Sequence, residues 1–199
     1  MSEIKRKNDD DDIEIGSSEL NFRDSNGIYY IHGKIDESIP KNIIAPLVND
    51  IEQRKLLIKP LPIKFFITSF GGQASPSFDI INLFEYARSV NIEIYTYVTS
   101  HAMSAASMIA CAGHKRFVGK RACHMLHFAK SVDYSSNPIM SDRNNENLKL
   151  LQDEMIALYV KYSKGKLKEK QLRAELLPDS FYINGSEAII RSGLADEEF

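Results

Sequence analysis

Three side-chain types that together perform acyl transfer are spread along the sequence: a serine, Ser104, a histidine, His127, and an aspartate, Asp179. Ser104 separates a strand-like stretch from an alanine-rich segment. We therefore expect it at the start of a helix, where free backbone N–H groups can face developing negative charge. In such a triad the serine attacks, the histidine takes its proton and the aspartate orients the imidazole. Each residue alone also has an ordinary explanation: a helix N-cap, a half-buried histidine and a turn aspartate.

Two neighbours compete for the first two roles. Ser107 lies one turn inside the expected helix, where its hydroxyl can bond to a main-chain carbonyl, so a structural role is favoured. His127 is expected near the carboxyl end of a strand over 123–128. His124 precedes it by three residues, so strand alternation turns it to the opposite face. The sequence therefore predicts Ser104 and His127 as the reacting pair.

A pair of glycines, Gly71 and Gly72, ends another strand-like run. Without side chains, this backbone can approach a ligand closely and present an N–H group to an oxyanion. A plain turn explains two glycines equally well.

The elements that must position these residues alternate between strand and helix. Strands are expected over 28–31, 63–68 and 92–98, and the helical patterns between and after them include 44–51, 75–89 and 102–112. Such alternation indicates an α/β fold whose parallel sheet carries its site at the carboxyl ends of the strands. A long helix with one apolar stripe is expected from about 142 to 163, a strand-like run over 180–183, and a short helix from Ser186 as N-cap to Gly193.

Composition narrows the function further. The 199 residues suffice for one domain, expected over 27–199 after a mobile, charged arm over 1–26. The 25 basic and 27 acidic residues nearly balance, which argues against nucleic-acid binding. Cys111 and Cys123 lack metal-ligand or redox spacing, so free thiols and no metal are expected. No apolar run is long enough for a membrane span, and we expect a cytoplasmic protein.

Taken in order, several segments resemble the proteolytic subunit family of the Clp protease, including its shorter phage-encoded and viral members. The resemblance covers about 27–199. It rests on I-Y-Y-I-H-G-K-I-D at 28–36, S-F-G-G at 69–72, S-H-A-M-S-A-A-S at 100–107, A-G-H-K-R at 112–116, H-M-L-H at 124–127, D-S-F-Y at 179–182, S-E-A at 186–188 and G-L-A-D at 193–196. Ser100 stands where the family motif has glycine, and Phe70 where it has proline. The segment after the histidine is not glycine-rich.

The resemblance implies a ClpP- or crotonase-like spiral of repeated β-β-α and βαβ units, with a protruding handle over about 128–165. It implies an ATP-dependent serine endopeptidase with Ser104, His127 and Asp179 as catalytic triad and no cofactor. The backbone N–H groups of Gly72 and Ala105 would form the oxyanion hole. The polypeptide substrate would bind as an added strand along the following residues: Gly71, Gln73, Phe128, Ala129 and Lys130.

The same resemblance implies an assembly of two stacked heptameric rings, a homo-tetradecamer around a closed chamber, fed by an AAA+ unfoldase. Two alternatives stay open. The changed motif positions are compatible with an inactive ring subunit of structural or regulatory function. A crotonase-type enzyme that acts on acyl-CoA thioesters would share the fold and its paired oxyanion N–H groups.

Overall fold

The computed structural model describes residues 21–129, 138–177 and 179–199. Its strands are β1 (Asn21–Arg23), β2 (Ile28–Ile31), β3 (Ile63–Ser69), β4 (Ile94–Met103), β5 (Lys115–Val118), β6 (Cys123–Leu126), β7 (Phe181–Asn184) and β8 (Glu197–Glu198). Its helices are the π-helical turn η2 (Pro40–Ile44), α1 (Ala45–Arg54), α2 (Ala74–Ser89), α3 (Ala105–Ala112), α4 (Pro138–Tyr162), α5 (Glu169–Leu176) and α6 (Ser186–Ser192).

The strands form a mixed sheet with a parallel centre, ordered β1-β2-β3-β4-β5-β8. β2, β3, β4 and β5 pair in parallel, as the alternation of strands and helices predicts. β4 is long enough to pair with β5 through its first half and with β6 through His101–Met103. β7 then pairs antiparallel with β6. The carboxyl ends of β3, β4 and β6 consequently lie close together.

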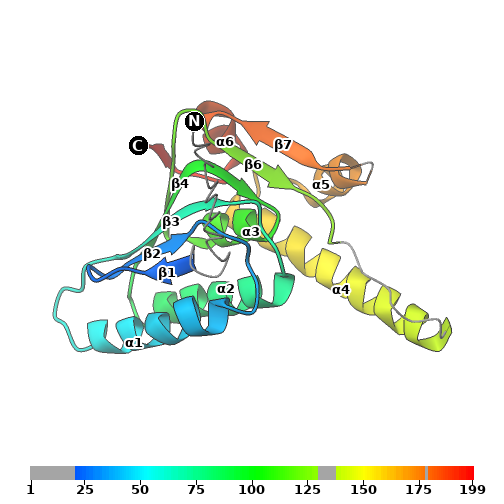
Figure 1. The fold of residues 1–199 in the computed structure, drawn as a ribbon. Helices are drawn as coiled ribbons and strands as arrows, with labels where there is room; N and C mark the ends of the chain where they lie inside the picture. Colours follow the sequence, from blue (N-terminus) through cyan, green and yellow to red (C-terminus); the bar gives the residue numbers. More distant parts are fainter. Residues whose placement is uncertain (1–20, 130–137, 178) are drawn as a thin grey trace, which may run out of the picture.

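One face of the sheet carries the hydrophobic core. Ile63, Phe65 and Ile67 alternate along β3 and are fully buried, whereas Lys64 between them is exposed. Helices α1 and α2 lie along this face in Figure 1, and α3 packs against α2 and α4. The apolar side of each helix thus covers the apolar side of the strands, which is the main favourable term in folding.

The other face carries a row of aromatic rings, one from each of four neighbouring strands. Tyr30 stacks on Phe66 with ring centroids 5.9 Å apart, Phe66 on Tyr97 at 4.7 Å, and Tyr97 on Phe117 at 4.5 Å. These are cross-strand neighbours on one pleat, so the row stabilises the register of the sheet.

A buried ion pair ties the end of the chain to β5. Arg116 donates two hydrogen bonds to Asp196, at 2.9 and 2.6 Å, and two more to the carbonyls of Tyr162 and Gly193, at 2.6 and 2.8 Å. Arg116 is 4% exposed. Two of the quoted motif segments, A-G-H-K-R and G-L-A-D, therefore meet in space as one structural clamp.

Helix α4 leaves the body of the domain, and its first turns extend well beyond the other elements in Figure 1. Its inner half is anchored by the buried Met155, Ile156, Tyr159 and Tyr162, whereas Leu150 is 64% exposed. The expected long helix is thus confirmed, although it starts at Pro138 rather than near 142, and its function as a handle stays a prediction.

Several boundaries differ from the sequence-based expectations. β1 belongs to the sheet, so the ordered domain starts before Gly27, and only residues 1–20 of the expected arm lie outside the described part. β4 continues to Met103, so α3 begins at Ala105. Gly185, not Ser186, is the N-cap of α6. Both cysteines are free thiols, as expected. No helix among the described residues is long and apolar enough to cross a membrane.

Candidate active site

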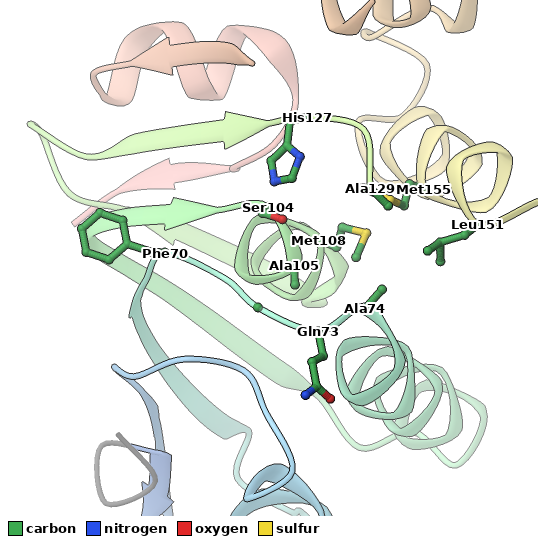
Figure 2. A pocket seen from close by; sticks show the side chains of 11 residues that line it. Phe70, Gln73, Ala74, Ser104, Ala105, Met108, His127, Ala129, Leu151 and Met155 are labelled. Carbon is green, nitrogen blue, oxygen red and sulfur yellow. The ribbon is translucent and has the colours of Figure 1, made fainter. Parts of the chain in front are cut away.

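Three strand ends converge on one cavity of about 490 Å³. The segment after β3 contributes Gly72 and Gln73, the end of β4 contributes Ser104, and the residue after β6 is His127. Figure 2 shows the His127 imidazole pointing from its strand end toward Ser104. The cavity lies at the carboxyl ends of the strands, where the topology predicted these side chains, and it brings together Gly72, Ser104 and His127, which are 23 to 55 positions apart in sequence.

Ser104 occupies a strained turn between β4 and α3. Its backbone has φ 53° and ψ −123°, a region that non-glycine residues rarely adopt. Its N–H donates to the carbonyl of Met125 at 2.7 Å, and its own carbonyl accepts from the N–H of Ser107 at 2.9 Å. The hydroxyl makes no capping hydrogen bond to the helix, so the ordinary N-cap role does not explain this serine. A strained strand-to-helix turn is how nucleophilic serines are presented in other hydrolases.

The two glycines are required by close approach, which a plain turn does not demand. A Cβ atom on Gly71 would lie 2.5 Å from the Met103 carbonyl oxygen, and one on Gly72 would lie 2.1 Å from that of Ile35. Both also have positive φ, 94° and 154°. Gly71 thus backs onto the turn of Ser104, while Gly72 forms a parallel bridge with Ile35.

His127 and Asp179 are not hydrogen-bonded to each other. His127 follows β6 and Asp179 precedes β7, and the pairing of these two strands ends with Leu126 opposite Phe181. The His127 Nδ1 atom lies 2.5 Å from the Phe128 carbonyl oxygen, and the exposed Asp179 carboxylate accepts from Ser180 at 3.3 Å. Neither Ser104 nor Asp179 hydrogen-bonds to His127 in the described part of the chain. The expected catalytic triad therefore stays a prediction.

The competing pair, Ser107 and His124, is connected but inaccessible. The Ser107 hydroxyl lies 2.9 Å from His124 Nδ1, and the two residues are 0% and 1% exposed. Burial, assisted by the positive charge of Arg116, lowers the pKa of His124 to about 4. A substrate cannot reach this pair, so the structural role predicted for both residues is confirmed.

The remaining predicted positions are distributed around the cavity. Gln73, Ala105 and Ala129 line it, Phe128 is half-buried beside it, and Lys130 lies outside the described residues. Sequence reasoning missed the apolar wall, formed by Ala74, Met108, Leu151 and Met155. Leu151 and Met155 belong to the apolar stripe of α4, which indicated a buried helix face but not a cavity.

The rim of the cavity carries the residue that replaces the motif proline. Phe70 is 74% exposed, and its ring lies 4.3 Å from that of His101, centroid to centroid.

Among the described residues, no group of acidic, histidine and cysteine side chains could hold a metal ion.

This geometry defines an α/β protein with a serine on a strained turn, a histidine facing the same cavity and a glycine-lined backbone segment beside both. The chain belongs to the Clp protease family, whose family model matches residues 19–197. The match confirms the resemblance drawn from the motifs and extends it by eight residues toward the N-terminus. It identifies the chain as a ClpP-type peptidase by family. A comparison with curated proteins found no match.

Proposed function

We propose that this chain is an active serine endopeptidase that cleaves polypeptides through an acyl-enzyme. Ser104 attacks the scissile carbonyl, His127 accepts and returns the proton, and Asp179 orients the imidazole. The observation that carries the proposal is the conformation of Ser104. Its backbone has a positive φ, its side chain lines the cavity, and its hydroxyl makes no capping hydrogen bond to α3. Strain of this kind persists only where the surrounding structure imposes it, and it gathers at functional sites.

Two backbone amides are suited to stabilise the oxyanion. Ala105 is the first residue of α3, and the first N–H groups of a helix have no partner within it. Gly72 lines the same cavity as Ala105. Amide donors that are fixed before the reaction stabilise charge that develops only in the transition state.

The substrate backbone is proposed to bind as an added strand between the segment 71–73 and the segment 128–130. Gln73 and Ala129 line the cavity from these two sides. Between them the wall is apolar: Met108 and Met155 are 1% and 3% exposed. We therefore infer that the residue before the cleaved bond is apolar.

Catalysis requires one rearrangement of the recorded geometry. His127 has to turn its Nδ1 atom from the Phe128 carbonyl toward Asp179. The pairing of β6 with β7 supports this, because the same register continued outward would bring Asp179 across from Phe128. Catalytic hydrogen bonds are often long or misaligned before substrate binds and tighten in the reacting complex. A substrate strand along 128–130 would change the surroundings of that carbonyl.

The assembly remains part of the proposal. Helix α4 protrudes from the body (Figure 1), which fits a handle that contacts a second ring. Membership of the Clp protease family supports ring formation and polypeptide substrates, so we propose two stacked heptameric rings served by an ATP-dependent unfoldase. The family match also favours peptide-bond hydrolysis over the alternative acyl-CoA chemistry.

The test is labelling of the purified protein with a fluorophosphonate probe, together with hydrolysis of a short fluorogenic peptide. Ser104→Ala should lose both, and His127→Ala should lose turnover by about 10³-fold or more. Ser100→Ala is the matched control, because Ser100 is an exposed serine four residues earlier on β4. Labelling of Ser104→Ala at the wild-type level would reject Ser104 as the nucleophile.

A second candidate, an inactive ring subunit, is favoured by one observation. The His127 Nδ1 atom is engaged by Phe128, and Asp179 by Ser180, so the recorded side chains do not form a triad. The same peptide assay separates the two functions. Turnover by the homomer that disappears in Ser104→Ala would reject the inactive subunit, whereas its absence in correctly assembled rings would support it.

A further inference from the structure

A polar cluster is buried next to the Ser104 turn, and none of its members lines the cavity. It consists of Ser107 on α3, His124 on β6 and Tyr159 on α4, which are 0%, 1% and 0% exposed. Their surroundings are the apolar core, including Ile109 and Leu126. Burying three polar side chains costs free energy unless they bond to one another or to the backbone, so their arrangement needs an explanation.

The cluster connects α4 to the backbone of the proposed nucleophile. The Tyr159 hydroxyl donates a long hydrogen bond, 3.4 Å, to the carbonyl oxygen of Ser104. The Ser107 backbone N–H also donates to this carbonyl, at 2.9 Å, and the Ser107 hydroxyl lies 2.9 Å from His124 Nδ1. Three elements distant in sequence thus meet at the peptide group that follows the strained residue.

Chemistry assigns a direction to these hydrogen bonds. Tyr159 can only donate to a carbonyl, so its hydroxyl is the donor to Ser104. The Ser107 hydroxyl acts to lower the pKa of Tyr159, against the larger raising effect of burial. The hydrogen bond between Ser107 and His124 can run either way, depending on the imidazole tautomer.

The other imidazole nitrogen favours one tautomer. His124 Nε2 is buried and has no hydrogen-bond partner within the described part of the chain. Buried N–H groups without a partner are rarer in proteins than under-satisfied acceptors, so Nε2 is assigned the lone pair and Nδ1–H donates to Ser107.

We propose that Tyr159 is a positioning residue for Ser104. Its hydroxyl holds the Ser104 carbonyl and with it the positive-φ turn that presents the nucleophile, while the Ser107–His124 pair supports the same carbonyl from α3 and β6. Tyr159 touches neither substrate nor cavity, so it acts only through Ser104. This inference rests on the proposed peptidase function, because positioning matters only if Ser104 reacts.

The test is Tyr159→Phe, which removes one oxygen atom and keeps the ring. The second-order rate of fluorophosphonate labelling at Ser104 and kcat on a short peptide should both fall about tenfold, with KM within twofold of wild type. Tyr162→Phe is the matched control, since it removes a hydroxyl three residues later on α4 that bonds to Glu85 instead. It should leave labelling, kcat and KM unchanged.

Ser107→Ala provides a second variant that needs little repacking, and it should lower labelling and kcat in the same direction. Equal labelling rates in Tyr159→Phe, Ser107→Ala and wild type would overturn the positioning role while leaving the peptidase intact. If wild-type Ser104 is not labelled at all, the peptidase proposal fails separately. A crystal structure of Tyr159→Phe then decides the positioning role: a changed Ser104 φ supports it, and an unchanged turn overturns it.

Discussion

A Cβ atom on Gly71 would stand 2.9 Å from the Cβ atom of Ser104. That distance is shorter than carbon atoms tolerate, so the backbone at 71 lies directly against the turn that carries the proposed nucleophile. Gly71 also has φ 94°, which strains any residue with a side chain. The pair links the segment after β3 to the turn after β4 without a hydrogen bond between their side chains.

Gly71→Ala should therefore damage both stability and reactivity. Strain at positive φ and overpacking against Ser104 together predict a loss of about 2–4 kcal/mol in the free energy of unfolding. Displacement of the turn predicts at least about tenfold slower fluorophosphonate labelling. Denaturant unfolding and labelling kinetics measure the two effects.

Gly165→Ala is the control: Gly165 has φ 73°, but the nearest atom to an added Cβ is the Lys168 Nζ atom, at 3.8 Å. It should cost about 1 kcal/mol and leave labelling unchanged. Equal effects of the two substitutions would contradict the contact.

The Arg116–Asp196 clamp predicts a loss of stability in strong acid. Burial raises the pKa of Asp196, but the hydrogen bonds and charge of Arg116 outweigh this and hold it at about 2, below the ordinary 3.8. A depressed carboxyl pKa stabilises the native state above the unfolded value, and this contribution disappears as the pH falls from about 4 to about 2. Allowing for solvent screening, it amounts to about 1–2 kcal/mol. Chemical denaturation across this range should show a smaller acid-dependent loss in Asp196→Asn than in wild type.

The control for the clamp is Glu197→Gln, which removes the neighbouring, more exposed ion pair with Lys115. It should change the free energy of unfolding by less than about 0.5 kcal/mol at neutral pH. An acid-dependent loss in Asp196→Asn as large as that of wild type would show that Asp196 is not the responsible group.

The buried His124 predicts a second pH range, separate from that of Asp196, over which the free energy of unfolding changes. Its pKa of about 4 in the native state lies below the ordinary 6.5, because burial and then Arg116 disfavour the charged form. The unfolded state therefore binds a proton first, and stability falls as the pH drops from about 6.5 to about 4, by about 3 kcal/mol in total. His124→Val should flatten this part of the stability curve and leave the part between pH 4 and 2 unchanged. An unaltered slope between pH 6.5 and 4 would refute the assignment.

The apolar wall of the cavity predicts a substrate preference that one substitution should shift. Leu151→Trp fills space between α4 and α3, so cleavage after large apolar residues should fall about tenfold relative to cleavage after alanine. The ratio of kcat/KM values for the two peptides measures this. Leu150→Trp, at a 64% exposed position on the same helix, should leave the ratio unchanged. A common shift in both variants would point to a general effect on α4 instead.

Most of the fold followed from local patterns. The alternating runs that became β2, β3 and β4 were recognisable because each half-buried strand carries its own apolar periodicity. β1 was not, since N-F-R has no such pattern, and the strand depends on Asn21, whose amide donates to the Lys34 carbonyl and accepts from the Gly33 N–H. Helix α5 was missed for a similar reason, because its buried residues are only Leu172 and Leu176.

The side chains that line the cavity were more predictable than the contacts that they make. Strand alternation separated His127 from His124, and helix position separated Ser104 from Ser107, because both arguments depend on local geometry. The hydrogen bond from Tyr159 to the Ser104 carbonyl joins α4 to the turn before α3, and the contact of His127 with the Phe128 carbonyl depends on the path of the chain after β6. Neither contact has a signature in residue spacing. The catalytic role of Asp179 stays a prediction.

Helix α4 has one end in the interior, beside Ser104, and the other well outside the body of the domain. The helix that protrudes from the domain is therefore the same helix that supplies Leu151 and Met155 to the cavity wall and the Tyr159 hydroxyl to the Ser104 carbonyl.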